Sequence, residues 1–334
     1  MRRGLEKLPI GKLGRNELSS SVLRYVGSRR KDVILWPKYG EDAGAFKLEK
    51  QATVVLASDP ITGSKNLVGW LAVHINANDV AVCGARPEWM SSCILLPEGS
   101  TVLDFRNIAK QVSRAAASIG VAVVTGHSEV APHVNSPIVV GTIAGRLVSK
   151  KLITSSGARP GDYIIMTKTA GLEGIAILAT DFHRLLSDRG VKSEVIKRAA
   201  GYYSRISVVY EAMQLARSGF VTAMHDPTEG GVLGGLYEVA TASNCGFTVY
   251  AEHIPVSREG EEISKALGID PLKLISSGVL LATVKKPPKN RGFRVIGKIT
   301  KRREGMRVIT KTSEEKITQQ PIDELWRILR EYGD

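Results

Sequence analysis

The sequence has few cysteines and no long apolar run. Cys83, Cys93 and Cys245 are its only cysteines, and none belongs to a CxxC pair. An odd number at this spacing argues against a disulfide framework and against a structural zinc site. No run of about 18 apolar residues occurs, so no transmembrane helix is expected. The charged start, residues 1–7, has no apolar stretch after it and does not resemble a secretory signal. We therefore expect a cytoplasmic protein without a membrane partner.

Aromatic residues and several catalytic motifs are also scarce or missing. Aromatic residues make up 6% of the chain and hydrophobic residues 43%, which favours an α/β core of Val, Ile, Leu and Ala. The sequence lacks a Gly-x-Ser-x-Gly elbow, an HExxH motif, a Walker loop and a GxGxxG motif after a strand. Hydrolase triads and dinucleotide binding therefore have no motif support. A length of 334 residues favours two domains.

Strand-like and helix-like segments alternate along the chain. Apolar β-branched runs predict strands at 53–58, 94–96, 121–124, 137–147, 163–167, 247–251, 278–284 and 293–299. Helical spacing predicts helices at 17–26, 66–82, 104–119, 172–186, 208–218, 230–242, 263–267 and 323–332. The turn-rich stretch 154–162 predicts a boundary between two domains. We expect an N-terminal extension at 1–30, one domain at 31–152 and a second at 153–334.

A first group of candidate site residues is acidic. Asp42 follows a glycine in a turn, Asp59 ends a predicted strand, and Asn78 and Asp79 lie within a predicted apolar helix. Mg²⁺ prefers oxygen ligands, usually a few carboxylates together with nucleotide phosphates. Taken singly, Asp42 or Asp59 fits a turn or a helix cap as well. Asp79 is a poor helix former among apolar neighbours, where an unpaired charge is costly. The spacing alone leaves both a metal site and structural roles open.

A second group lies in the glycine-rich stretch 224–235. Asp226 and Thr228 flank a proline in a turn and cap sequence, and Gly230 and Gly231 open a predicted helix. Glycines allow close approach of a ligand, and a helix N-terminus presents free N–H groups to anions. A capped helix that packs tightly through its glycines explains the pattern equally well.

A third group follows the predicted strand at 121–124. Gly126, His127 and Glu129 stand where a site at the carboxyl end of a strand is expected. His127 fits a general base, a metal ligand or an ordinary loop histidine.

The charge is strongly basic. Lys and Arg number 46 against 33 for Asp and Glu, a net charge of +13, and much of the excess lies between Lys285 and Arg307, where Glu304 is the only acidic residue. Such a balance favours anionic partners. This segment shows no interleaved aromatic residues and no zinc or helix-turn-helix signature, so a solvated basic hairpin is favoured here over a nucleic-acid partner.

Taken together and in this order, the segments resemble the superfamily of AIR synthetase, selenophosphate synthetase, thiamine-monophosphate kinase and the hydrogenase-maturation protein HypE. The resemblance rests on residues 40–45, 58–59, 78–79 and 84–87, and its HypE branch is favoured by 225–231, 254–256 and 267–272. It implies a two-domain α/β protomer whose N-terminal domains pair into a shared β-barrel in a homodimer. It further implies ATP bound along the interface, with Asp42, Asp59 and Asp79 on Mg²⁺ and the phosphates. A hydrogenase-maturation protein is then a possible partner.

Several positions depart from the HypE pattern. His127 and Glu129 replace an acidic residue and a lysine, Glu229 replaces an arginine, and Ser277 replaces a glutamate. The chain also ends at Asp334 without the terminal cysteine that accepts the carbamoyl group in HypE. These changes predict a retained ATP site and a rebuilt, more acidic acceptor site.

The resemblance therefore implies an Mg²⁺- and ATP-dependent enzyme that transfers a phosphoryl group to an unidentified acceptor, with His127 or Glu129 accepting a proton. Three alternatives remain at this point. The first is a small-molecule kinase similar to thiamine-monophosphate kinase, and the second is a non-catalytic nucleotide-binding assembly protein. The third is nucleic-acid binding through the basic segment 285–307.

Overall fold

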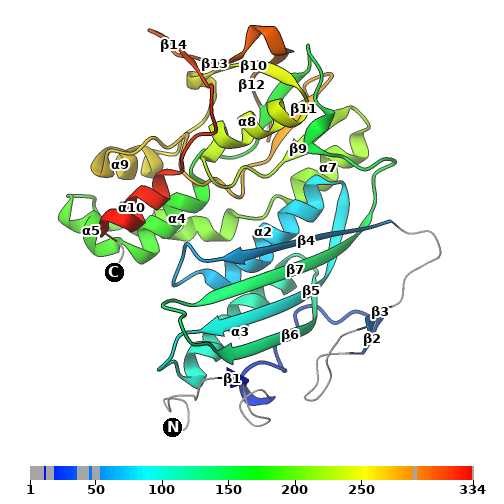
Figure 1. The fold of residues 1–334 in the computed structure, drawn as a ribbon, viewed down its shortest axis with the longest axis vertical. Helices are drawn as coiled ribbons and strands as arrows, with labels where there is room; N and C mark the ends of the chain where they lie inside the picture. Colours follow the sequence, from blue (N-terminus) through cyan, green and yellow to red (C-terminus); the bar gives the residue numbers. More distant parts are fainter. Residues whose placement is uncertain (1–10, 13–18, 36–44, 47–52, 289–291, 333–334) are drawn as a thin grey trace. The chain divides into compact units, whose positions relative to one another are not determined.

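The computed structural model describes residues 11–12, 19–35, 45–46, 53–288 and 292–332. Two compact units divide the chain: residues 1–80 with 85–147, and residues 81–84 with 148–334. Both units mix helices and strands, which confirms the predicted two-domain α/β class (Figure 1). No helix in the described ranges combines the length and the apolar character that a membrane crossing requires.

The first unit is built on a five-stranded sheet in the order β1-β6-β5-β7-β4. Only β5 and β6 are parallel to each other, and the other neighbours are antiparallel. Figure 1 shows α2 and α3 on one face of this sheet. The strands are β1 (Gly11–Lys12), β4 (Val54–Ile61), β5 (Ala85–Leu96), β6 (Ala122–Val130) and β7 (Ile138–Leu147), with a small ribbon of β2 (Val33–Leu35) and β3 (Ala45–Phe46) beside them.

The two helices of this unit form for different reasons. α2 (Val68–Val82) is apolar around most of its circumference, and residues such as Leu71, Ala77 and Val80 are buried, as expected of a helix enclosed by the protein. α3 (Val102–Ser118) is amphipathic, and a capping box between Thr101 and Asp104 satisfies its first N–H groups.

The second unit is built on a seven-stranded sheet in the order β14-β13-β10-β12-β8-β11-β9. Its strands are β8 (Tyr163–Met166), β9 (Val221–His225), β10 (Cys245–Tyr250), β11 (Leu281–Val284), β12 (Arg294–Lys301), β13 (Met306–Ile309) and β14 (Glu314–Lys316). Its helices are α4 (Leu172–Asp181), α5 (His183–Asp188), α6 (Ser193–Ala200), α7 (Val209–Ser218), α8 (Gly231–Ala242), α9 (Arg258–Leu267) and α10 (Glu324–Tyr332).

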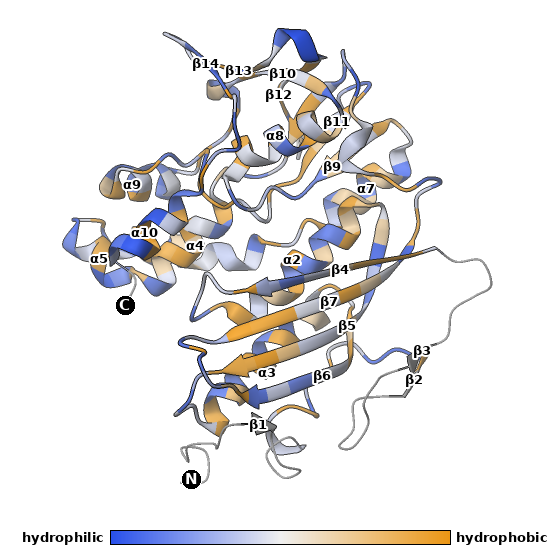
Figure 2. Cartoon of the chain, viewed as in Figure 1, coloured by the Kyte–Doolittle hydropathy of each residue, from blue (hydrophilic) through white to orange (hydrophobic). Residues whose placement is uncertain are grey.

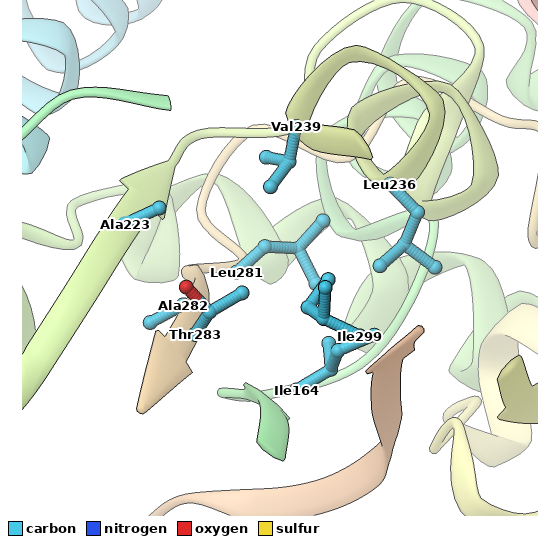
Figure 3. Close-up of a pocket in the computed structure, with 8 residues that line it drawn as sticks. All are labelled: Ile164, Ala223, Leu236, Val239, Leu281, Ala282, Thr283 and Ile299. Atoms are coloured by element: carbon cyan, nitrogen blue, oxygen red, sulfur yellow. The ribbon is translucent and has the colours of Figure 1, made fainter. Parts of the chain in front are cut away.

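One apolar cluster packs against each face of this sheet. Leu233 and Leu236 of α8 pack with Phe247 and Ile299 against one face. Ala212 and Leu215 of α7 pack against Ile165 on the other face. A cavity of about 10 Å³ lies between α8 and the sheet, lined almost entirely by apolar side chains (Figure 3). A space of this size holds at most one water molecule, so it is a packing gap and not a ligand site.

Several predicted elements differ from the structure. The helix predicted at 172–186 is broken at Phe182 into α4 and α5. The basic segment is not a hairpin, because β10 lies between β12 and β13. Of the helix predicted at 17–26, only residues 19–21 are helical in the described part. The elements α6, β9, β13 and β14 were not predicted.

Candidate functional site

The centre of the candidate site in the first unit is a pair of carboxyl groups, Asp59 on β4 and Asp79 on α2. They lie within hydrogen-bonding reach, and the pKa of Asp79 is raised to about 8 by burial first and then by the hydrogen bond and charge of Asp59. Two carboxylates this close repel each other when both are ionised, and a bound cation relieves that repulsion. The structure thus brings together two of the three predicted Mg²⁺ ligands.

Asn76 and Gly141 hold this pair in place. The backbone N–H of Asp59 donates to Asn76 Oδ1 at 2.8 Å, and Asn76 Nδ2 donates to the Asp59 carbonyl at 3.2 Å. Gly141 lies opposite Asp59 on β7, and a Cβ there would approach Ala72 O to 2.5 Å. Only glycine therefore lets α2 pack this closely on the strand. Neither residue was predicted, although a glycine inside a predicted strand signals close backbone approach.

Gly126 lies on the same face of the sheet as Asp59. Asp59, Gly141, Ser92 and Gly126 are register partners across β4, β7, β5 and β6. A Cβ at Gly126 would lie 2.5 Å from Ser92 O, so glycine is required here for strand packing. The prediction that β6 ends before Gly126 is wrong, because the strand continues to Val130. Asp59 likewise lies inside β4, which continues to Ile61.

His127 and Glu129 lie on the opposite, uncovered face of this sheet. They alternate with Gly126 along β6, so their side chains point away from the row that contains Asp59. His127 Nε2 and Glu129 Oε2 are 3.0 Å apart, and both side chains are about one-third exposed, at 35% and 33%. Cys93 lies beside His127 on β5, and burial followed by the charge of Glu129 raises the pKa of its thiol. Within one protomer, the structure does not bring this pair to the carboxylates.

The donor set fits Mg²⁺ in its chemistry. Asp59 and Asp79 supply hard oxygen ligands, and Mg²⁺ commonly completes its shell with phosphate and water. No group of three His, Cys, Asp or Glu residues with metal-binding geometry occurs among the residues that the structure describes. Asp42, the third predicted ligand, lies outside the described residues. Asn78, next to Asp79, is fully buried in α2.

In the second unit, Asp226 and Thr228 fix the loop between β9 and α8. Asp226 is buried, and its Oδ1 accepts a hydrogen bond from Gly278 N at 3.3 Å. The Thr228 carbonyl accepts from Gly231 N at 3.1 Å and from Ser276 N at 3.4 Å. This loop is therefore tied to the 276–278 segment.

The N–H groups at the start of α8 are already used. Gly230 and Gly231 have φ values of 77° and 63°, a region that favours glycine. Gly230 N donates to Asp323 Oδ2 at 2.7 Å, and Gly231 N donates to Thr228 O. These contacts contradict the prediction that both amides are free to donate hydrogen bonds to an anion. That Gly230 and Gly231 bind the nucleotide stays a prediction, and they would have to do so through atoms other than these two N–H groups.

A buried carboxyl group that the sequence analysis missed lies beside Ser277. Burial raises the pKa of Glu173 on α4 to about 7, and Ser277 hydrogen-bonding lowers it in part. Asp323, 3% exposed, has its pKa raised to about 6 by burial, with the charge of Glu229 adding to the rise. A carboxyl group therefore lies beside Ser277, although position 277 itself carries none. A charged residue within the apolar stretch 171–178 was the signal for it.

His225 is part of a hydrogen-bonded chain that joins three segments. His225 Nε2 lies 2.8 Å from Glu238 Oε2 on α8, and Nδ1 lies 3.2 Å from Ser155 Oγ. Gln320 Nε2 donates to Glu238 Oε1 at 2.9 Å. This chain connects the start of the second unit with β9, α8 and the segment before α10.

The two-domain α/β architecture and the paired carboxylates define the class of protein. Residues 40–147 match the N-terminal domain of AIR synthase related proteins, and residues 159–316 match the C-terminal domain. The chain belongs to the AIR synthase related family, and within it to the HypE-like proteins.

Particular relatives carry names from hydrogenase maturation. A protein of Methanocaldococcus jannaschii named for hydrogenase expression and formation is 31% identical, with 76% of each chain covered. The carbamoyl dehydratase HypE of Cupriavidus necator is 31% identical, with 74% of this chain and 70% of that one covered.

Solved structures agree on the fold. A crystal structure of the hydrogenase maturation protein HypE in complex with ATP has a TM-score of 0.74 at 22% identity, covering 93% of this chain and 96% of that chain. A thiamine-monophosphate kinase of Stenotrophomonas maltophilia has a TM-score of 0.66 at 20% identity, covering 85% and 92%. The predicted superfamily and its HypE branch are confirmed.

Proposed function

We propose that this chain is an Mg²⁺- and ATP-dependent enzyme that transfers the γ-phosphoryl group of ATP to an acceptor. The observation that carries the proposal is the pair Asp59 and Asp79, two carboxyl groups within hydrogen-bonding reach on different elements. Support also comes from the HypE structure determined with ATP and from relatives named carbamoyl dehydratase. Asp42, Asn78 and Gly126 would complete the proposed nucleotide site of the first unit. A nucleotide-binding role for Asp226 and Thr228 of the second unit stays a separate prediction.

Asp59 and Asp79 would hold Mg²⁺ beside the nucleotide, and the bound ion would neutralise charge on the phosphates. An oxygen of the acceptor would attack the γ-phosphorus while the bond to the ADP oxygen breaks. His127 and Glu129 lie on the other face of the sheet from Asp59 within one protomer, so this pair would take the proton of the attacking oxygen only across the proposed homodimer interface. Because Glu129 accepts from His127 Nε2–H when the imidazole is neutral, the other ring nitrogen, Nδ1, is the proton acceptor in that tautomer.

A homodimer forms part of this proposal. Leu56 is 66% exposed on the sheet face that α2 and α3 leave uncovered, and a second copy would bury it. His127 and Glu129 lie on this face, so a partner protomer is what would enclose them with an acceptor. The acidic character of Glu129 favours an acceptor that is cationic or bound to a metal.

Calorimetric titration with ATP in the presence of Mg²⁺ tests the nucleotide site. We expect saturable binding by the wild type and by Glu98→Gln, an exposed acidic residue of the same unit. Asp79→Asn should weaken Mg²⁺-dependent binding by about tenfold or more, the loss of one charged metal contact. Equal binding by Asp79→Asn and wild type would contradict the assignment of Asp79.

Product analysis separates the remaining alternatives. Release of ADP and phosphate at a rate that depends on Asp79 supports the proposed enzyme, and a stable phosphorylated small molecule supports a kinase. Binding of ATP without turnover above background supports a nucleotide-binding assembly protein. The HypE–HypF complex, whose HypE chain has a TM-score of 0.65 and 23% identity, motivates a search for a maturation-protein partner.

A further inference from the structure

One face of the second sheet is open where the chain is most basic. Residues that alternate with the apolar core positions of β12, β10 and β13 point to the face away from α8. On β12, Lys298 is exposed and Thr300 is half-buried, whereas Ile299 between them is buried. On β10, Tyr250 is 43% exposed. Helix α7 packs on β8 and β11 on this face, but it does not cover β12, β10 and β13.

A single row of side chains crosses five neighbouring strands on this open face. The register partners run from Lys316 on β14 to Arg307, Thr248, Lys298 and finally Tyr163 on β8. We call these five residues the basic row. Neighbouring strands are about 4.8 Å apart, so the row is about 19 Å long. Three of its five members are cations, and they come from three different strands.

Three polar side-chain atoms in and beside the basic row lack a hydrogen-bond partner in the described structure. Arg307 Nε, Thr248 Oγ1 and Thr300 Oγ1 are buried and have no hydrogen-bond partner within the described part of the chain. The nearest acidic group, Glu314, lies 3.9 Å from Arg307 and is itself 42% exposed. An unpaired buried donor costs free energy, so these atoms favour an anionic ligand that accepts hydrogen bonds.

Neighbouring strands place aromatic residues beside the basic segment, although none is interleaved with its cations in the sequence. Lys298 Nζ lies 4.6 Å from the centre of the Tyr163 ring, and Tyr250 lies two residues beyond Thr248 on the same face. Further exposed cations are Lys301 at the end of β12 and Arg302 and Arg303 in the turn after it, which is strongly hydrophilic in Figure 2. The expectation that the basic segment lacks interleaved aromatics holds for the sequence but not for the folded sheet.

We propose that the basic row, with Tyr250 beside it, binds single-stranded nucleic acid. Cations and hydroxyl donors suit phosphate oxygens, and an exposed tyrosine offers a surface on which a base stacks. Tyr250 is the one large hydrophobic side chain on β10, β13 or β14 that is strongly exposed in the described structure. A protein interface normally has several such residues at its centre, which favours nucleic acid over an acidic protein.

The test is fluorescence anisotropy with a labelled oligouridylate of about 12 nucleotides, titrated with the full chain at several salt concentrations. The row variant carries Lys298→Gln, Arg307→Gln and Lys316→Gln. A control variant with the same loss of charge carries Lys192→Gln, Lys197→Gln and Lys265→Gln, three exposed lysines of the same unit. A milder variant, Lys298→Gln with Lys316→Gln, replaces only exposed residues and guards against misfolding at Arg307.

We expect the row variant to bind at least about tenfold more weakly at low salt, and the slope of log affinity against log salt to fall by about 2, since each phosphate contact contributes about 0.7. The control variant should bind nearly as the wild type does, and Tyr250→Ala should weaken binding about tenfold. The proposal is overturned by an absence of saturable binding at about 50 mM salt, or by equal losses in the row and control variants. A polyglutamate peptide that competes as well as the oligonucleotide, with no effect of Tyr250→Ala, would also overturn it in favour of an acidic protein.

Discussion

The carboxyl groups of Asp59 and Asp79 lie against each other between β4 and α2, although they are twenty positions apart in the chain. Asp79 projects from a largely apolar helix, and Asp59 is anchored by Asn76, three residues before Asp79 on that helix. A fold selected for stability alone would place apolar or paired residues here. The repulsion in this pair is therefore a strain whose benefit we expect to find in cation binding.

Asp79→Asn should affect stability and function in opposite directions. Because the pKa of Asp79 is raised to about 8, the folded protein must bind a proton there at neutral pH, whereas asparagine needs none. Without divalent cations we therefore expect a gain of about 1 to 2 kcal/mol in unfolding free energy. The same variant should lose Mg²⁺-dependent ATP binding. Urea denaturation with a chelator present, compared with denaturation in Mg²⁺ and ATP, measures both effects. A clear loss of stability without cations would mean that the pair has a structural role.

The order of the main helices and strands could be predicted from the sequence, because the spacing of apolar residues within each element depends only on neighbouring positions in the chain. α2, α3, α7, α8 and α10 lie within a few residues of their predicted positions. The short strands β9, β13 and β14 were not predicted because three to five residues carry too little periodicity. β6 was predicted too short because Gly126 was taken as its end, whereas that glycine fits the close approach of β5.

The candidate site was only partly predictable for a different reason. The resemblance to a family identified Asp59, Asn78, Asp79, His127 and Glu129, but the side of the sheet on which each lies depends on register. Contacts between distant segments, such as Glu173 with Ser277 or Gly230 with Asp323, leave no local pattern in the sequence. The amide of Gly230 was predicted to be available because its acceptor, Asp323, lies far away in the chain.

Gly141→Ala should displace the carboxylate pair indirectly, because the new side chain contacts α2 and not the two carboxyl groups. The new Cβ would lie 2.5 Å from both Ala72 O and Asn76 Nδ2, so α2 would have to move away from β7. We expect a loss of about 2 to 4 kcal/mol in unfolding free energy and weaker ATP binding. Gly201→Ala is the control, because a Cβ there meets nothing within 4 Å. It should be neutral or stabilise slightly, by up to about 1 kcal/mol. Similar stability for the two variants, measured by urea denaturation, would contradict the packing argument.

Glu173 should make the protein less stable as the pH rises. Its pKa is about 7 in the folded state and 4.5 as the ordinary value, so the folded state holds the proton more tightly. The stabilising effect is complete below about pH 4.5 and is lost as the pH rises through about 7. A shift of this size corresponds to about 3 kcal/mol. In Glu173→Gln this decline should be absent, so that the variant's advantage over the wild type grows between pH 4.5 and 8.

Urea denaturation at a series of pH values measures this difference. Glu194→Gln, at an exposed position on α6, is the control and should keep the full decline of the wild type. Burial raises the pKa of Asp323 in the wild type as well, and its charge adds to the raised pKa of Glu173, so part of the difference between the two proteins comes from this pair. Parallel stability curves for the wild type and Glu173→Gln would show that Glu173 is ionised in the folded protein at neutral pH.

Asp323→Ala should loosen the start of α8. Asp323 Oδ2 accepts the Gly230 N–H at 2.7 Å, and Oδ1 accepts the Leu325 N–H at 2.7 Å, so one carboxyl group joins the starts of α8 and α10. Its removal leaves a buried N–H without an acceptor, which costs about 1 to 3 kcal/mol. We expect faster hydrogen exchange in the first turn of α8 and in α10, with the helices of the first unit unchanged. Asp323→Asn keeps one carbonyl acceptor and should recover part of the protection. If exchange at Gly230 is unchanged in Asp323→Ala, then this helix start does not depend on the C-terminal segment.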